Sequence, residues 1–323
     1  MRPKLKEQPQ EPKELVARAA QLVHSSPREA RSVAAHAASA GVNDPPVVDA
    51  LGHVFLELGE DEEAAKHFLL CEGLDPLGSS SRLLTLAQLA EGGDAAAWYD
   101  KALGLIRGEE GEDRNARLCS ALCALAELYM TDLCMLPSAE AKCEAALLEA
   151  MTVDPGHMET LQTFASMRIS QQRTGDARNL VRLAVETWLS MGSSGELPAF
   201  DLRLNQAKLC METDLYEEAC RVLERLVEEE DSDMEVLYLL GLVLYEIGEE
   251  KPERRRAAWH QAGGYLDDHA ELYSQMQEHD EEGECVRRHV EEMQKAIAAT
   301  EVDMMGTDSD SNELEDYAWE DEE

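Results

Sequence analysis

Carboxylates are the side chains that dominate the chemistry open to this sequence. Its 323 residues include 67 Asp and Glu against 29 Lys and Arg, which gives a formal net charge of −38 at pH 7. The patterns that turn a side chain into a nucleophile, a metal ligand or a phosphate cradle (GxSxG, HExxH, GxGxxG, GxxxxGK[ST]) do not occur in the sequence. The sequence therefore predicts a protein that is not an enzyme, needs no cofactor and recognises positive charge.

Cysteine and histidine offer little further chemistry. The eight cysteines include no CxxC pair, and no Cys and His cluster has the spacing of a zinc site. We expect reduced thiols that pack as small apolar residues, and no metal centre. The strong negative charge also disfavours direct binding to nucleic acid or to an anionic membrane surface, because phosphates would be repelled.

A repeated alternation of small and large apolar residues indicates what positions these carboxylates. Counted from Pro45 as position 1, Gly52, Phe55, Ala64, Phe68 and Cys71 stand at positions 8, 11, 20, 24 and 27. Small residues let two helices approach closely, and large ones fill the space between neighbouring pairs. The comparable residues further along are Ala95, Tyr99 and Ala102; Ala126, Tyr129, Leu147 and Ala150; Ala165, Ala177, Val181 and Ala184; Ala207, Cys210, Ala219, Leu223 and Leu226; and, with a displaced second helix, Gly241, Leu244, Ala258, Ala262 and Tyr265.

This pattern resembles the tetratricopeptide repeat family over about 250 residues. The resemblance implies an all-α fold, a right-handed solenoid of paired helices. We expect a disordered N-terminal arm over 1–13, the solenoid over 14–270, capping helices over 271–300 that break near Gly283, and a disordered acidic tail over 301–323. An insertion is expected at 131–138.

The same resemblance implies a concave groove lined by the first helix of each pair. Carboxylates stand beside apolar or aromatic residues at the groove positions, which suits an extended Lys- and Arg-rich segment with apolar anchors. The predicted partner-binding residues are Asp49, His53, Leu56 and Glu57; Glu127 and Met130; Glu159, Gln162 and Ile169; Asp201, Leu204, Lys208, Met211 and Glu212; and Glu235, Tyr238, Leu242, Tyr245 and Glu246. Tyr317 and Trp319 in the tail are predicted to contact the partner as well.

The repeats and the acidic, aromatic tail at 313–323 together resemble the family of fungal assembly chaperones of the universal large-subunit ribosomal protein four. That resemblance implies a monomer that binds one newly made client through the client's long internal loop. It further implies a protein of cytoplasm and nucleus, which prevents aggregation of the client and delivers it to nuclear pre-ribosomes.

Other classes of function stay open at this point. A histone chaperone shares the charge argument, although the insertion at 131–138 holds only one acidic residue. A co-chaperone that clamps an acidic tail would need basic groove residues, and Asp49 and His53 stand where those would be required. A scaffold subunit of a larger complex would also fit the repeats.

Overall fold

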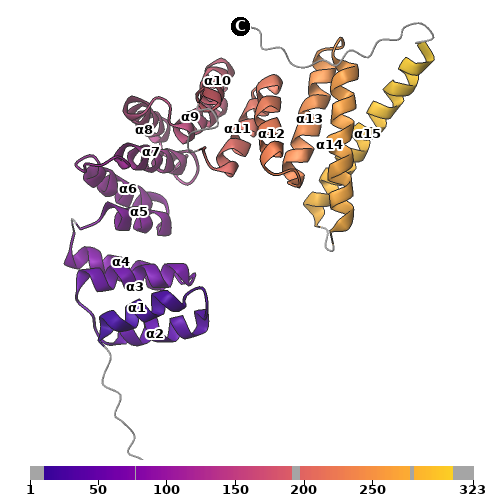
Figure 1. Ribbon diagram of the computed structural model, residues 1–323. Helices are drawn as coiled ribbons and strands as arrows, with labels where there is room; N and C mark the ends of the chain where they lie inside the picture. The colour runs from indigo at the N-terminus through magenta and orange to yellow at the C-terminus, as the bar shows by residue number, and fades with distance from the viewer. Residues whose placement is uncertain (1–10, 77, 191–196, 277–279, 308–323) are drawn as a thin grey trace, which may run out of the picture. The chain divides into compact units, whose positions relative to one another are not determined.

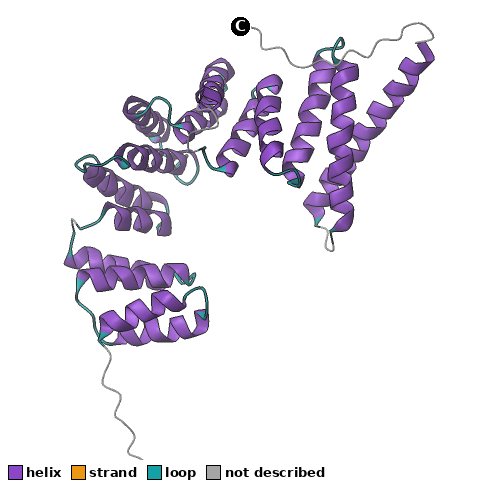
Figure 2. Ribbon diagram, in the orientation of Figure 1, coloured by secondary structure: helices purple, strands orange, loops and turns teal. Residues whose placement is uncertain are grey.

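The computed structural model describes residues 11–76, 78–190, 197–276 and 280–307, with no account of the side chains of 301–307. Within these ranges every regular element is an α-helix, and there are fifteen of them (Figure 2). The helices are α1 (Pro12–Leu22), α2 (Pro27–Ser39), α3 (Pro45–Glu57), α4 (Asp61–Leu74), α5 (Ser80–Leu89), α6 (Gly92–Ile106), α7 (Arg114–Met130), α8 (Ala139–Val153), α9 (Met158–Ser170), α10 (Thr174–Ser190), α11 (Phe200–Glu212), α12 (Tyr216–Glu229), α13 (Met234–Glu250), α14 (Arg255–Gln275) and α15 (Glu281–Thr307). The predicted all-α fold is confirmed.

The helices form two compact units, Met1–Met167 and Arg168–Glu323. In the first unit α1 packs on α2, α3 on α4, α5 on α6 and α7 on α8. In the second unit α11 packs on α12, α13 on α14, and α15 against α14. Consecutive helices that pack as pairs are the architecture of a tetratricopeptide-like solenoid (Figure 1).

Local sequence signals explain where the helices begin and turn. Proline opens α1, α2 and α3, where its missing N–H and fixed φ cost nothing. The hydroxyl of Ser79 accepts a hydrogen bond from the Arg82 amide, and an Asp233 carboxylate oxygen accepts one from the Val236 amide at 2.9 Å. Because Pro12 already starts α1, the first helix begins two residues earlier than the sequence indicates.

The predicted small–large packing is present in the core. A Cβ placed on Gly52 would lie 2.7 Å from the Phe68 ring, so α3 and α4 are in contact at a point that only glycine allows. Gly241 meets Leu266 in the same way, at 2.6 Å. Leu266 is fully buried, whereas Tyr265, which the sequence pattern placed at this position, is half-buried. The prediction for Tyr265 is wrong by one residue.

Three further features refine the expected organisation. The insertion at 131–138 forms turns between α7 and α8, as predicted. At the C-terminal end α14 runs on to Gln275 and α15 starts at Glu281, so the interruption precedes Gly283. α15 also extends to Thr307, past the predicted start of the tail. The arm over 1–10 and the tail over 308–323 lie outside the described residues.

Two other kinds of feature are absent from the described residues. None of the helices described combines the length and apolarity that crossing a bilayer requires. No group of three or more His, Cys, Asp or Glu side chains in those ranges is arranged to hold a metal ion.

Candidate protein-binding surface

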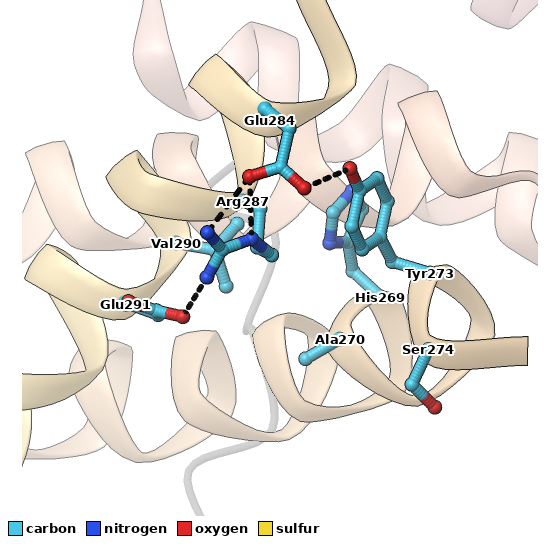
Figure 3. A pocket seen from close by; sticks show the side chains of 8 residues that line it. All are labelled: His269, Ala270, Tyr273, Ser274, Glu284, Arg287, Val290 and Glu291. Atoms are coloured by element: carbon cyan, nitrogen blue, oxygen red, sulfur yellow. Dashed lines mark hydrogen bonds and ion pairs between the residues drawn. The ribbon is translucent and has the colours of Figure 1, made fainter. Parts of the chain in front are cut away.

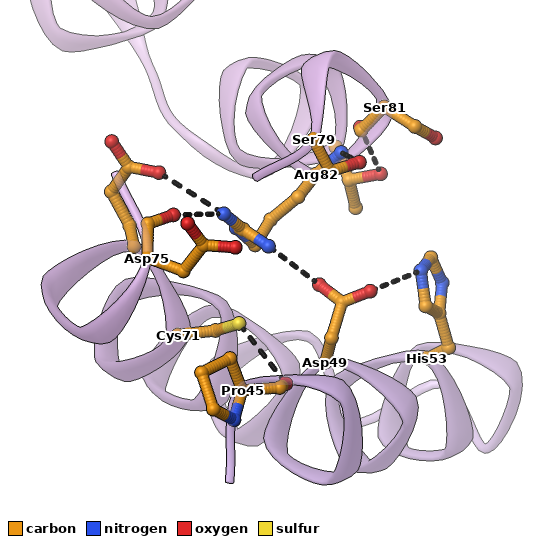
Figure 4. Close-up of polar contacts among 10 residues, drawn as sticks. Pro45, Asp49, His53, Cys71, Asp75, Ser79, Ser81 and Arg82 are labelled. Carbon is orange, nitrogen blue, oxygen red and sulfur yellow. Dashed lines mark hydrogen bonds and ion pairs between the residues drawn. The ribbon is translucent and has the colours of Figure 1, made fainter. Parts of the chain in front are cut away.

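In the first unit the predicted groove residues begin on α3, where a buried arginine changes their charge. The Arg82 guanidinium, from α5, is only 3% exposed and lies 3.3 Å from an Asp49 carboxylate oxygen (Figure 4). It also lies 3.5 Å from a Glu72 carboxylate oxygen and donates to the Asp75 carbonyl at 2.6 Å. Asp49 therefore faces α5 and neutralises a buried cation, so it offers a partner less negative charge than the sequence implies.

His53 extends the same cluster toward solvent. Its Nε2 is 3.8 Å from the second Asp49 oxygen, one helical turn away. The imidazole side chain is 44% exposed, and its ring meets the edge of Phe68 at 5.0 Å between centroids. Of the α3 residues predicted to bind a partner, Glu57 is exposed, and the side chain of His53 is more exposed than that of Asp49, at 44% against 26%.

The next pair of first helices, α7 and α9, brings two predicted carboxylates together. The Ser120 hydroxyl donates to Glu159 at 2.6 Å, and the Thr163 hydroxyl donates to Glu127 at 3.3 Å. Partial loss of water around Glu127 raises its pKa, although the residue reaches the surface, and the charge of Glu159 raises it further. A carboxylate such as Glu127, whose charged form is made costly by lost water and a neighbouring acid, is stabilised when a cation approaches. Met130, one turn further along α7, is half-buried beside them.

Together these contacts define the acidic face of unit 1, which we name from Asp49, His53, Glu57, Glu127, Met130 and Glu159. Its helices are linked in order: α3 to α5 through Arg82, α5 to α7 through a 2.8 Å bond from Arg117 to Ser80, and α7 to α9 through Ser120.

In the second unit the predicted residues of α11 and α13 divide into an acidic and an aromatic part. Lys208 binds Glu235 at 2.6 Å, so the one cation among the predicted residues is paired across the two helices. Asp201 and Glu212 are exposed on α11, and Met211 is half-buried between them. The exposed carboxylates of this pair therefore outnumber its cation.

On α13 the two tyrosines predicted to face a partner contact other helices. The Tyr238 hydroxyl lies 2.8 Å from Nδ1 of His289, on α15. The Tyr245 ring stacks on Trp259 of α14, with centroids 4.8 Å apart. Burial raises the pKa of Glu246, and the neighbouring Glu249 and Glu250 raise it further. Leu242, between the tyrosines, is half-buried.

Sequence reasoning missed two residues that shape these faces, Arg82 and His289. Helix α5 lacks the small–large signature of the other first helices, so its arginine was not considered. The cap formed by Ser79 three residues before it was the available signal. His289 lies 51 residues after Tyr238, and no sequence pattern indicates that pairing. Tyr317 and Trp319 lie outside the described residues.

With this geometry in place, comparison with known proteins identifies relatives. No known family profile matches the chain. A probable assembly chaperone of rpl4 from Emericella nidulans is 34% identical over 279 residues, which cover 77% of this chain and 72% of that protein. One of the same description from Schizosaccharomyces pombe is 32% identical over 214 residues, 62% of this chain and 64% of that protein.

A solved structure agrees with the sequence relatives. The structure of the assembly chaperone of RpL4, Acl4, is 32% identical, covers 76% of this chain and 100% of that chain, and superposes with a TM-score of 0.62. The shared helical fold and the identity across most of the Emericella nidulans protein lead to one conclusion. This chain belongs to the family of assembly chaperones of rpl4.

Proposed function

We propose that this protein is an assembly chaperone whose client is a ribosomal protein of the rpl4 type. The observation that supports this most directly is the 34% identity to a probable assembly chaperone of rpl4 over 77% of the chain. Each unit carries proposed client contacts of its own: the acidic face of unit 1, and, in unit 2, the carboxylates of Asp201, Glu212, Glu235 and Glu246. The client segment is extended and rich in Lys and Arg, and it is bound by one copy of the chaperone.

Electrostatics supports this assignment and predicts how binding should behave. A net charge of −38 attracts a cationic segment over a distance of about 8–10 Å at physiological salt. Carboxylates whose pKa is raised, such as Glu127 and Glu246, gain a partner when the client's cation arrives. Half-buried Met130, three residues after Glu127, and half-buried Met211, next to Glu212, supply apolar contact. Affinity should therefore fall as salt is added.

In the cell this masking would act before ribosome assembly. Extended basic segments aggregate or bind RNA at the wrong place until they reach their site. We propose that the chaperone meets its client in the cytoplasm and accompanies it into the nucleus. There ribosomal RNA competes for the same cations and releases the client to the pre-ribosome.

The test is binding of the purified full-length chain to purified rpl4-type ribosomal protein, measured by isothermal titration calorimetry and size-exclusion light scattering. We expect a one-to-one complex. The double variant Glu127→Gln with Glu159→Gln should weaken it about three- to tenfold, because two carboxylates at the contact are removed. A matched control removes two exposed carboxylates of second helices, Glu62→Gln with Glu186→Gln, and should leave the affinity within twofold.

Affinity purification from native cytosol separates this proposal from its alternatives. Recovery of one ribosomal protein in near-equal amount, without the rest of the ribosome, supports it. Recovery of histones instead would favour a histone chaperone. A large complex without a basic component would favour a scaffold, and either result would overturn the proposal.

A further inference from the structure

A cavity of about 350 Å³ lies between α14 and α15 (Figure 3), and its wall residue His269 contacts Tyr238 of α13, with ring centroids 5.9 Å apart. The sequence indicated only a polar cap for this region. A volume of this size is at the lower end of those that hold small ligands in proteins, and it accommodates one long side chain. Its wall is formed by His269, Ala270, Tyr273, Ser274, Glu284, Arg287, Val290 and Glu291.

The charged groups of the wall carry an excess of negative charge. Arg287 donates to one Glu284 oxygen at 2.8 and 3.1 Å, and it also binds Glu291 (Figure 3). The Tyr273 hydroxyl donates to the other Glu284 oxygen at 3.1 Å. Two carboxylates thus share one guanidinium, and each carboxylate accepts up to about four hydrogen bonds. The donors of Arg287 are directed to these carboxylates, so an anion would meet net negative charge.

A buried imidazole completes the wall. His269 is 3% exposed, and its Nδ1 has no hydrogen-bond partner within the described residues. Burial lowers the pKa of His269, so the ring is neutral at neutral pH and does not repel a cation. The ring lies nearly parallel to that of Tyr273, at 11° and 6.3 Å between centroids. Aromatic faces beside carboxylates attract cations.

We propose that this cavity binds a lysine or arginine side chain of the bound client. Ammonium and guanidinium groups carry N–H donors for the carboxylates of Glu284 and Glu291 and for the imidazole, and their apolar stems fit against Val290 and Ala270. A buried ring nitrogen without a partner is costly, so an occupant that donates a hydrogen bond to the ring gains affinity. The source of the side chain rests on the proposed function, whereas the preference for a cation rests on the cavity alone.

The preference is tested first without any client. The full chain, labelled with ¹⁵N, is titrated with Nα-acetyl-arginine amide, and the imidazole resonances of His269 are followed by NMR. Uncharged Nα-acetyl-norleucine amide serves as the control probe. We expect the His269 resonances to shift and saturate at millimolar arginine probe and to stay in place with norleucine. Unchanged His269 resonances with both probes would overturn the proposal.

Two neighbouring variants on α15 then distinguish binding in this cavity from nonspecific attraction to the acidic surface. Glu291→Gln removes a carboxylate from the wall, and Glu292→Gln removes an exposed one next to it. Glu291→Gln should weaken the arginine probe about three- to tenfold, and Glu292→Gln less than twofold. Circular dichroism checks that both variants fold as the wild type does. Equal effects of the two variants would overturn the assignment.

The client supplies the last arm. Glu291→Gln should also reduce the affinity for the rpl4-type protein, again more than Glu292→Gln. If the wild type binds the client and both variants bind it equally well, the cavity is not a client site while the proposed function stands. If the arginine probe shifts the His269 resonances but the wild type binds no rpl4-type protein, the proposed function is refuted. The cavity then still prefers a cation, but the cation does not come from that client.

Discussion

Replacement of Arg82 by methionine is the sharpest test of how the acidic face of unit 1 is built. Methionine keeps the length of the buried stem but removes the charge that Asp49 and Glu72 neutralise. It also removes the 2.6 Å hydrogen bond to the Asp75 carbonyl. Removing one partner of a buried ion pair costs about 3–5 kcal/mol, because the remaining charge is left without compensation.

The expected loss for Arg82→Met is at or just below the low end of that range. The side chains of Asp49 and Glu72 are 26% and 14% exposed, so water replaces part of the lost interaction. The distances of 3.3 and 3.5 Å are also long for charge-assisted bonds. We therefore expect a decrease of about 2–3 kcal/mol in the free energy of unfolding. The matched control is Arg18→Met, whose ion pair with Glu29 is half-exposed on both sides and contributes about 0–1 kcal/mol.

The assay is urea unfolding at pH 7, followed by circular dichroism. Repeat arrays can unfold in segments, so hydrogen exchange of the α3–α5 amides provides the local readout. A double-mutant cycle adds Asp49→Asn, which should destabilise the wild type but relieve the Arg82→Met variant by removing its unpaired carboxylate. If Arg82→Met costs no more than Arg18→Met, or if Asp49→Asn has the same effect in both backgrounds, the account of this face is wrong.

Three further outcomes test the packing, the ionisation and the thiols. Gly52→Ala should lower the free energy of unfolding by about 2 kcal/mol or more, because the added methyl meets the buried Phe68 ring. Gly73→Ala, which has open space around it in α4, should raise the free energy of unfolding by about 0.5–1 kcal/mol. Urea unfolding measures both changes. Glu246→Gln should raise the free energy of unfolding at neutral pH, because folding raises the pKa of this carboxyl and its ionised form therefore costs stability above that pKa. In a pH series, the difference in stability between the variant and the wild type should vanish below the ordinary carboxyl range, where wild-type Glu246 is protonated. An alkylating reagent should label the exposed thiols of Cys134 and Cys285 in the folded protein and the six buried thiols only after unfolding. Burial protects these six, and it raises the pKa of Cys123 and of Cys210 to about 12. Mass spectrometry of the peptides identifies the rapidly labelled residues.

The helix pairs could be predicted from sequence because the alternation of small and large residues along the chain is also what lets two helices pack closely. A glycine or alanine followed sixteen residues later by a large apolar residue, as in Gly52 with Phe68 and Ala207 with Leu223, marks two helices in close contact, and Gly52 with Phe68 shows that contact directly. The rule failed by one residue at Tyr265. Helix α14 is long and starts late, so no neighbouring repeat sets the register there, and Leu266 fills the space beside Gly241.

The charge state of the candidate site could not be predicted in the same way. The position of Asp49 within its helix predicts which face of that helix it occupies. The cation that neutralises it, however, belongs to Arg82, 33 positions later in the sequence. The aromatic residues of α13 show the same limit, since Tyr238 meets His289 of α15 and Tyr245 meets Trp259. Periodicity reports which side of its own helix a residue occupies, whereas these partners depend on how later helices pack.

Within the described ranges, the basic residues of this acidic chain pair with some of its carboxylates and leave others on the first helices without a cation. Within unit 1, Arg107 binds Glu149 of α8 at 2.8 Å. Within unit 2, Arg182 of α10 binds Glu218 of α12 at 3.1 Å, and Arg254 reaches Glu217 at 2.9 Å. These pairs connect second helices of neighbouring repeats, and Arg82 with Asp49 and Lys208 with Glu235 connect first helices in the same way, so the scarce cations join neighbouring repeats. First helices keep carboxylates such as Glu127 and Glu246, whose pKa is raised by lost water and neighbouring acids. A protein selected only for stability would neutralise those carboxylates first. Carboxylates without a cation lower the stability of the free protein, as expected of a surface that receives its cations from a bound partner.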